Sequence, residues 1–243
     1  GTNFAANNLP GALSVIAIAE KNNLLNAPET YMDKIAVGKD VPKDVVDLDY
    51  SIKKNVENLA DIKNKSPEDL TVCILDRARH KKKIDELSDL KVKLKLITDG
   101  DISGALLVCD KKYNVDLFLG IGGGPEGVLS ASALDAYNCH FQGRFIFNDN
   151  KDISRAKQMG IRELDKKYDL KEIVTGDSIF CATGITSGDL VSGIKVNNNK
   201  FISETLVTHK SSNFKKVIRQ ENNLILWFQS PIKSGVKENL ALI

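Results

Sequence analysis

The stretch Val115-Asp-Leu-Phe-Leu-Gly-Ile-Gly-Gly-Gly-Pro-Glu-Gly127 decides the fold, because an apolar run leads directly into closely spaced glycines. The following segment, Val128-Leu-Ser-Ala-Ser-Ala-Leu134, is typical of a helix. Glycines between a strand and a helix let backbone N–H groups converge on a ligand that side chains would block. Pro125 suits a first helical position, which puts Glu126 at the positive end of the helix. There Glu126 either caps the helix or holds a cation over a phosphate.

Segments typical of strands and of helices alternate around this stretch. The predicted strands are residues 70–75, 92–97, 115–119 and 144–147. Such alternation indicates a parallel sheet with crossover helices, and ligands of these sheets bind beyond the carboxyl ends of the strands. Three strand ends carry polar sequences: Asp76-Arg-Ala-Arg-His80, Asp99-Gly-Asp101 and Gly120 to Gly127. We therefore expect these three ends to line one crevice.

After about residue 175 the pattern changes to short apolar runs separated by Gly, Asn and Ser. These runs are residues 178–183, 201–209, 214–219 and 224–229. They indicate antiparallel hairpins, which we expect to form a second sheet beside a strand at residues 13–19. The predicted domains are residues 1–66, joined by the hairpins of 178–243, and an α/β domain over 67–177 that carries the substrate and metal segments.

Composition and charge narrow the class of protein. The formal net charge of +2 argues against a nucleic-acid partner held by broad phosphate contact. No apolar stretch reaches the roughly 18 residues that span a membrane, and the opening Gly1-Thr2-Asn3 lacks a secretory leader. The four cysteines form no C-x-x-C pair, which is typical of reduced thiols. We expect a cytoplasmic protein with no nucleic-acid or membrane partner.

Residues 122–127 also satisfy the pattern G-x-G-x-x-G of dinucleotide-binding sites. Asp149 follows at roughly the distance of a ribose-binding acid. Two features count against this interpretation: Glu126 would place a negative charge beside a pyrophosphate, and Pro125 removes a hydrogen-bond donor. A divalent cation between Glu126 and a phosphate would remove the first objection, because the ion reverses the local charge.

Three further candidates leave alternatives open. Asp101 suits the N-cap of the helix that follows it, whereas Asp99 and Asp101 together could accept hydrogen bonds from sugar hydroxyls or bind metal. Arg77 and Arg79 alternate at a strand end, so they are either a forked phosphate site or two surface arginines. Tyr31 lies in a loop-like segment, and a half-buried aromatic residue is its simplest interpretation.

An arginine pair, a carboxylate pair and a glycine-rich stretch with one acid suit a phosphorylated polyol and a divalent metal. The chain also contains the segments Leu25-Asn-Ala-Pro-Glu-Thr-Tyr-Met32, Thr98-Asp-Gly-Asp101, Gly120 to Val128, Gln142-Gly-Arg144, Ala182-Thr-Gly-Ile-Thr186 and Glu204-Thr205. On these segments the chain resembles the class II fructose-1,6-bisphosphatases of bacteria, in the lithium-sensitive, metal-dependent sugar phosphatase superfamily. The resemblance implies an α/β fold: a layered α-β-α-β-α sandwich with one mixed or antiparallel sheet and one mainly parallel sheet with crossover helices.

The resemblance also implies roles for individual residues. Glu126 matches a ligand of a catalytic Mg²⁺ or Mn²⁺, and the hydroxyl of Thr2 matches one that helps position the attacking water. The implied substrate-binding residues are Gly1, Thr2, Tyr31, Arg77, Ala78, Arg79, Asp99, Gly100, Asp101 and Gly123. Tyr31 and the arginine pair would hold the phosphate remote from the reaction, and Asp99 to Asp101 would contact the sugar. Arg77 replaces a lysine common in the family.

The implied activity is hydrolysis of the 1-phosphate of fructose 1,6-bisphosphate to give fructose 6-phosphate, a step of gluconeogenesis, by a homo-oligomeric enzyme (dimer or tetramer). The alternatives are a sedoheptulose-1,7-bisphosphatase, an inositol phosphatase and, from another class, a non-catalytic dinucleotide-binding domain. The arginine pair favours a bisphosphate. Because the family's other metal-binding acids precede the position of Gly1, we expect an N-terminally incomplete form with little catalysis in isolation.

Overall fold

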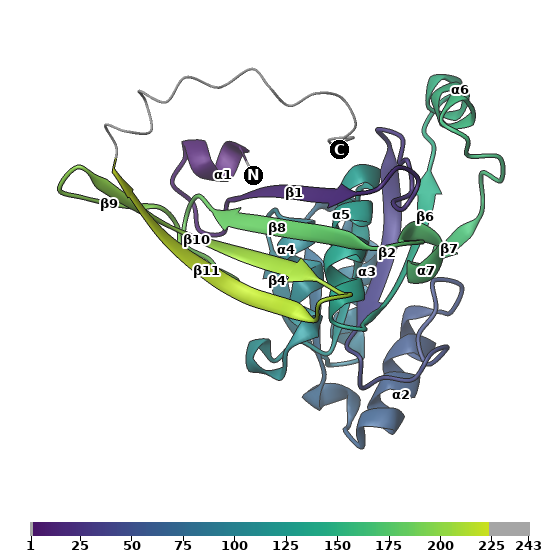
Figure 1. The fold of residues 1–243 in the computed structure, drawn as a ribbon. Helices are drawn as coiled ribbons and strands as arrows, with labels where there is room; N and C mark the ends of the chain where they lie inside the picture. Colours follow the sequence, from purple (N-terminus) through teal and green to yellow (C-terminus); the bar gives the residue numbers. More distant parts are fainter. Residues whose placement is uncertain (1, 224–243) are drawn as a thin grey trace.

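The computed structural model describes residues 2–223, which form two β-sheets with helices between and outside them (Figure 1). The antiparallel sheet contains β1 (Leu13–Ala19), β8 (Ser178–Gly184), β10 (Lys200–His209) and β11 (Phe214–Asn223) in this order, with β9 (Lys195–Asn197) paired to β10. The mixed sheet contains, in spatial order, β4 (Lys93–Ile97), β3 (Thr71–Leu75), β5 (Leu117–Gly123), β2 (Tyr31–Val37), β6 (His140–Ile146) and β7 (Lys167–Asp169).

Helices separate and cover these sheets. They are α1 (Thr2–Ala6), α2 (Ile52–Lys63), α3 (Lys81–Asp89), α4 (Asp101–Leu106), α5 (Gly124–Ala136), α6 (Asn150–Gln158) and α7 (Leu170–Ile173). Helices α4 and α5 lie between the sheets, in a core that joins Phe180 of β8 to Phe118 of β5. A second core contains Leu59 of α2, Leu87 of α3 and Ile74 of β3. Within residues 2–223 no helix combines the length and apolarity needed to cross a bilayer.

The expected two-sheet α/β architecture is confirmed. Strand β1 pairs antiparallel with β8 from Leu13↔Gly184 to Ala19↔Ser178, and β10 continues that sheet as expected for the hairpins. The run predicted at 224–229 lies outside the described residues. The second sheet is mixed: β4, β3, β5 and β6 run in one direction, whereas β2, which lies between β5 and β6, and β7 run in the opposite direction.

Strand β2 was not expected, since Tyr31 was placed in a loop. Asp33 and Lys34 interrupt its apolar pattern, yet the strand is largely buried between β5 and β6. It comes from the range 1–66 of the predicted first domain but pairs inside the sheet of the second. Its antiparallel direction places its first residue, Tyr31, opposite Gly123 at the carboxyl end of β5.

Asp116, a buried carboxylate just before β5, joins the amino-terminal edge of the sheet to the chain after α2. It accepts hydrogen bonds from Lys63 (2.8 Å), Lys65 (3.0 Å) and the backbone N–H of Thr71 (2.9 Å). Burial alone would raise the pKa of Asp116, but these three donors outweigh it and hold the pKa below its usual range. The ionised carboxylate therefore stabilises the fold.

Asp116→Asn should lower the free energy of unfolding by about 1–3 kcal/mol at pH 7, because it removes charge-assisted hydrogen bonds at a buried site. The wild-type contribution is present above about pH 4, the usual aspartate range, and is lost as pH falls through the lowered folded-state pKa. Urea denaturation of the wild type and the variant at pH 7 and below about pH 4 measures this difference in unfolding free energy. Glu57→Gln, which disturbs only an exposed pair with Lys53, is the matched control with an expected change below about 0.5 kcal/mol.

Candidate active site

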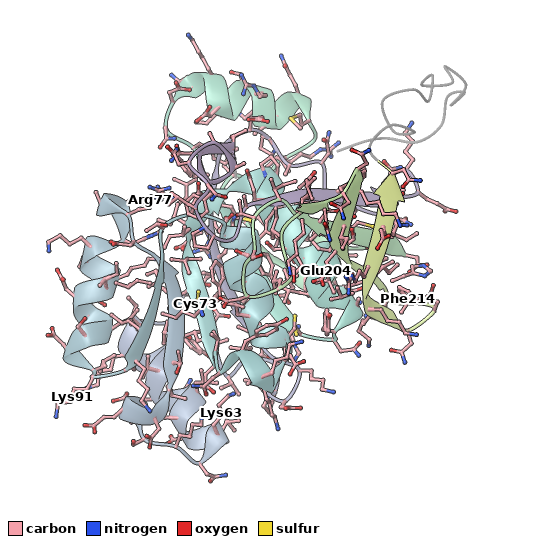
Figure 2. All side chains as sticks on the ribbon, turned by 90° about the vertical axis from the view of Figure 1, so that its left-hand side faces the viewer. Lys63, Cys73, Arg77, Lys91, Glu204 and Phe214 are labelled. Atoms are coloured by element: carbon pink, nitrogen blue, oxygen red, sulfur yellow. The ribbon has the colours of Figure 1, made fainter. Side chains whose placement is uncertain are left out.

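An open cavity of about 420 Å³ lies at the carboxyl ends of the parallel strands β4, β3 and β5. Its lining comprises Tyr31, Leu75, Arg77, Arg79, Asp99, Asp101, Gly122, Gly123 and Glu126. Figure 2 shows Arg77 at this end of the molecule, with Cys73 in the body of β3 and Lys63 and Lys91 at the opposite end. The expectation that the three polar strand ends meet in one crevice is confirmed.

The glycine-rich stretch is a strand running directly into a helix, not a loop. Strand β5 extends to Gly123, which is the N-cap of α5. The N–H of Gly124 donates to the carbonyl of Thr30 (2.7 Å), and Pro125 has no N–H. Fewer backbone donors therefore remain for a phosphate than the sequence suggested. Asp149, the candidate ribose-binding acid, instead caps α6 by accepting hydrogen bonds from the N–H groups of residues 151 and 152. Both observations argue against a dinucleotide site.

Glu126 is the half-buried acid of this junction. It lines the 420 Å³ cavity and also an adjoining one of about 310 Å³. Its carboxylate lies so close to Gly123 that a Cβ there would be 1.9 Å from Oε2, so a larger residue at this position would displace the carboxylate from its present place. Among residues 2–223 no lysine, arginine or histidine forms an ion pair with Glu126. An acid without a cationic partner at the edge of a cavity is available to a ligand.

A carboxylate oxygen is the donor type that Mg²⁺ and Mn²⁺ prefer. Glu126 therefore fits as one ligand of such an ion. Within the described part of the chain no group of three or more His, Cys, Asp or Glu side chains could enclose a metal. Residues 2–223 thus offer one oxygen-donating side of a metal site.

The two arginines are used differently. Arg79 donates to the carbonyl of Ile121 through Nε (2.9 Å) and Nη2 (2.8 Å), and its guanidinium lies 5.1 Å from the centre of the Tyr31 ring. Arg77 is exposed and forms one long ion pair, 3.7 Å from Nη2 to Asp99 Oδ1. Arg79 therefore forms part of the cavity wall as well as adding positive charge to it, while within residues 2–223 Arg77 forms no ion pair other than the one with Asp99.

His80, which the sequence did not single out, is fully buried directly after this pair. Its Nδ1–H donates to the carbonyl of Leu75 (2.8 Å) and its Nε2 accepts the N–H of Ile121 (2.7 Å), a pattern that requires the neutral imidazole. Burial lowers the pKa of His80. Together with Arg79, it engages both backbone polar groups of Ile121 and so fixes the end of β5.

Stability should therefore fall as pH decreases below about 6.5. The folded chain keeps His80 neutral while the unfolded chain binds a proton there, so the contribution is complete above that usual pKa and is lost progressively below it. Arg79 and Lys83 oppose protonation and Asp33 favours it. Urea denaturation between pH 8 and pH 5 should show a loss on the order of 1 kcal/mol that His80→Gln removes. His140→Gln should retain the wild-type dependence; equal slopes for both variants would assign it elsewhere.

The carboxylate pair is asymmetric. Gly100 occupies the N-cap of α4 with φ +80°, so the expectation that Asp101 is the N-cap is wrong, and Asp101 is the first helical residue. Asp99 accepts the N–H of Gly100 (2.9 Å) and is half-buried. Asp101 is buried and pairs through Oδ2 with Lys34, a lysine in β2 that sequence reasoning missed. Lysines are seldom fully buried, so nothing in the sequence pattern marks Lys34 as a buried partner of the site.

Two other predicted residues, Ala78 and Thr2, do not line the cavity. Ala78 begins the 3-10 helix Ala78–His80 and is exposed. Thr2 begins α1 and is exposed, but it does not line the cavity. Gly1 lies outside the described residues. The roles implied for these residues stay predictions.

Gly122→Ala should disturb the floor of the cavity, because its Cβ would lie 2.0 Å from Asp101 Oδ2 and 3.1 Å from Lys34 Nζ. Displacing a buried ion pair and overpacking should cost roughly 2–4 kcal/mol of unfolding free energy. Gly160→Ala is the control: it has φ +95° but nothing within 4 Å of the new Cβ, so only backbone strain of roughly 1–2 kcal/mol is expected. Equal losses in urea denaturation would show that the pair at Gly122 has room to move.

The fold and its cavity define a layered α/β protein with arginines and carboxylates in one cavity at the edge of the mixed sheet. The chain belongs to the family described as bacterial fructose-1,6-bisphosphatase, glpX-encoded, which matches residues 1–222.

Curated relatives are similar over most of the chain. One from Synechococcus sp. (strain JA-3-3Ab), named D-fructose 1,6-bisphosphatase class 2/sedoheptulose 1,7-bisphosphatase, is 38% identical over 225 residues, covering 87% of this chain and 65% of the relative. Proteins of the same name from Trichodesmium erythraeum (36%, with the same coverage) and Gloeobacter violaceus (35%, 88% of this chain and 65% of the relative) are also similar. The chain thus spans 65% of the length of these relatives.

Proposed function

We propose that the protein is a metal-dependent phosphatase that hydrolyses the 1-phosphate of fructose 1,6-bisphosphate, giving fructose 6-phosphate and inorganic phosphate. The observation that carries this proposal is one cavity lined by both an arginine pair and an acid, Glu126, that has no cationic partner within residues 2–223. A sugar bisphosphate needs two anion sites of different kinds, one that holds and one that reacts. Family membership supports the same chemistry.

Arg77 and Arg79 are proposed to hold the phosphate that does not react. The planar guanidinium suits phosphate oxygens, and Arg79 is already oriented by Ile121 and Tyr31. Holding one phosphate fixes the sugar in the cavity, so its binding energy can contribute to the reaction at the other end. Arg77 keeps the charge of the lysine common in the family and adds a forked donor.

Asp99 and Asp101 line the same cavity and are proposed to accept hydrogen bonds from sugar hydroxyls. Glu126 would hold Mg²⁺ or Mn²⁺ through a carboxylate oxygen, with Gly123 keeping space for that carboxylate. When bound, the ion supplies charge neutralisation at the phosphoryl oxygens and acidifies a water. The hydroxyl of Thr2 is proposed to help position the attacking water, and Gly1 and the backbone at Ala78 and Gly100 to contribute to binding, on the family resemblance.

The finer identity of the substrate is part of the proposal. The relatives carry names for both fructose 1,6-bisphosphate and sedoheptulose 1,7-bisphosphate activities. The arginine pair favours either of these over an inositol monophosphate, which has no second phosphate. A place in gluconeogenesis, a cytoplasmic location and a homo-oligomeric assembly complete the proposal, all on the family resemblance.

Isothermal titration calorimetry of the full chain with fructose 1,6-bisphosphate tests the arginine role. Arg77→Ala should weaken binding about tenfold or more, because one charge-assisted hydrogen bond contributes about 1.5–3 kcal/mol. Lys91→Ala, at the opposite end of the sheet and paired only with Glu68 among described residues, should leave binding unchanged. Equal binding by Arg77→Ala and the wild type would refute the phosphate role.

The same titration with Mn²⁺ tests the acid. Added Mn²⁺ should tighten binding of the bisphosphate to the wild type, and Glu126→Gln should remove that increment while leaving metal-free binding intact. Glu29→Gln, in the adjoining cavity, is the matched control and should keep the increment. Binding of NAD without any response to Mn²⁺ would instead support the dinucleotide alternative.

A further inference from the structure

Lys34 is a lysine buried inside a sheet, with 1% of its surface exposed, at the centre of β2. Its cross-strand partners are both glycines, Gly120 on β5 and Gly143 on β6. A Cβ at Gly127 would lie 3.2 Å from its Cε, and one at Gly122 would lie 3.1 Å from its Nζ. Glycines therefore line the path of this side chain from β2 to the cavity end of the sheet.

The partner of this cation is a residue of the cavity. The ammonium of Lys34 pairs with Asp101 Oδ2, whose side chain is 11% exposed. A buried charge without a partner costs several kcal/mol, so each of the two groups fixes the other. Within residues 2–223 no donor is assigned to Asp101 Oδ1. Within these residues, one oxygen of the carboxylate is therefore paired with Lys34, and the other can accept a hydrogen bond from a ligand.

We propose that Lys34 is a positioning residue that fixes the Asp101 carboxylate so that it accepts a hydrogen bond from a sugar hydroxyl in the cavity. Lys34 does not line the cavity, so it acts through Asp101. The inference rests on the proposed function, because it takes a hydroxylated phosphate ester as the ligand. A carboxylate already held in one orientation loses less conformational freedom on binding than one that must be ordered.

A purely structural role for this ion pair is the alternative, since it also joins β2 to the start of α4. Both roles predict a loss of stability when Lys34 is replaced, so stability alone does not separate them. They differ in the ligands affected. If the role is structural, replacing Lys34 weakens binding of every ligand of the cavity alike. If Lys34 positions Asp101, replacing it weakens binding only of ligands that donate a hydroxyl hydrogen bond to Asp101.

Calorimetry of the full chain with two probes tests the proposal: fructose 1,6-bisphosphate, and hexane-1,6-diol bisphosphate, which carries two phosphates and no free hydroxyl. Lys34→Met should weaken binding of fructose 1,6-bisphosphate about tenfold and change binding of the diol ester less than twofold. Asp101→Asn should do the same, and the double variant should be no weaker than Asp101→Asn alone, because Lys34 acts through that carboxylate. Should Lys34→Met fail to fold, the shorter, uncharged Lys34→Gln decides by the same ratio.

Lys83→Met is the matched control. It breaks an ion pair with Asp33 (2.8 Å) at the adjacent position of β2, and neither residue lines the cavity. It should leave the preference for the sugar over the diol ester unchanged.

Each outcome separates the two proposals. A wild type that binds neither probe overturns the proposed function and this inference with it. A wild type that binds both probes equally, or a Lys34→Met variant that weakens both equally or neither, leaves the phosphate site standing and overturns the role of Lys34. Additive losses in the double variant would likewise overturn it.

Discussion

The reversed direction of one strand constrains the whole candidate site. Strands β4, β3 and β5 run parallel, and their carboxyl ends alone would provide Asp99, Arg77 and Gly123. Strand β2 runs against β5, so its beginning, rather than its end, reaches the same edge and brings Tyr31 beneath Arg79. The same strand then carries Lys34 into the sheet, where Asp101 balances its charge.

Much of this arrangement could be predicted from sequence, because it follows from local pattern and a general property of sheets. The strand at 13–19 was placed with the bounds observed for β1, and the strands at 70–75 and 92–97 agree with β3 and β4 within one residue. Once those strands were expected to be parallel, the convergence of the polar sequences after β3 and β4 and at the end of β5 followed. The turn residues of the later hairpins likewise predicted the antiparallel sheet.

The remainder depended on contacts that no local pattern contains. Strand β2 was missed because a buried lysine looks like a surface residue until its partner, 67 positions away, is known. Residue type favoured Asp101 as the N-cap of α4, one of the alternatives left open, whereas Gly100 takes the left-handed conformation that starts this helix. His80 was overlooked because its role lies in two backbone contacts, one of them across the sheet to Ile121. The role of a buried polar group depends on its tertiary partners, and those partners cannot be predicted from the local pattern of a single sequence.

The core shared by the two sheets has a consequence for cooperativity. One apolar cluster includes Phe180 and Leu206 from the antiparallel sheet, Phe118 and Phe141 from the mixed sheet, and the buried face of α5. If one sheet unfolded alone, the apolar side chains that the other sheet contributes to this cluster would become exposed to water. The ranges expected to be separate domains should therefore lose structure in a single transition, and the most slowly exchanging amide protons should come from both sheets together.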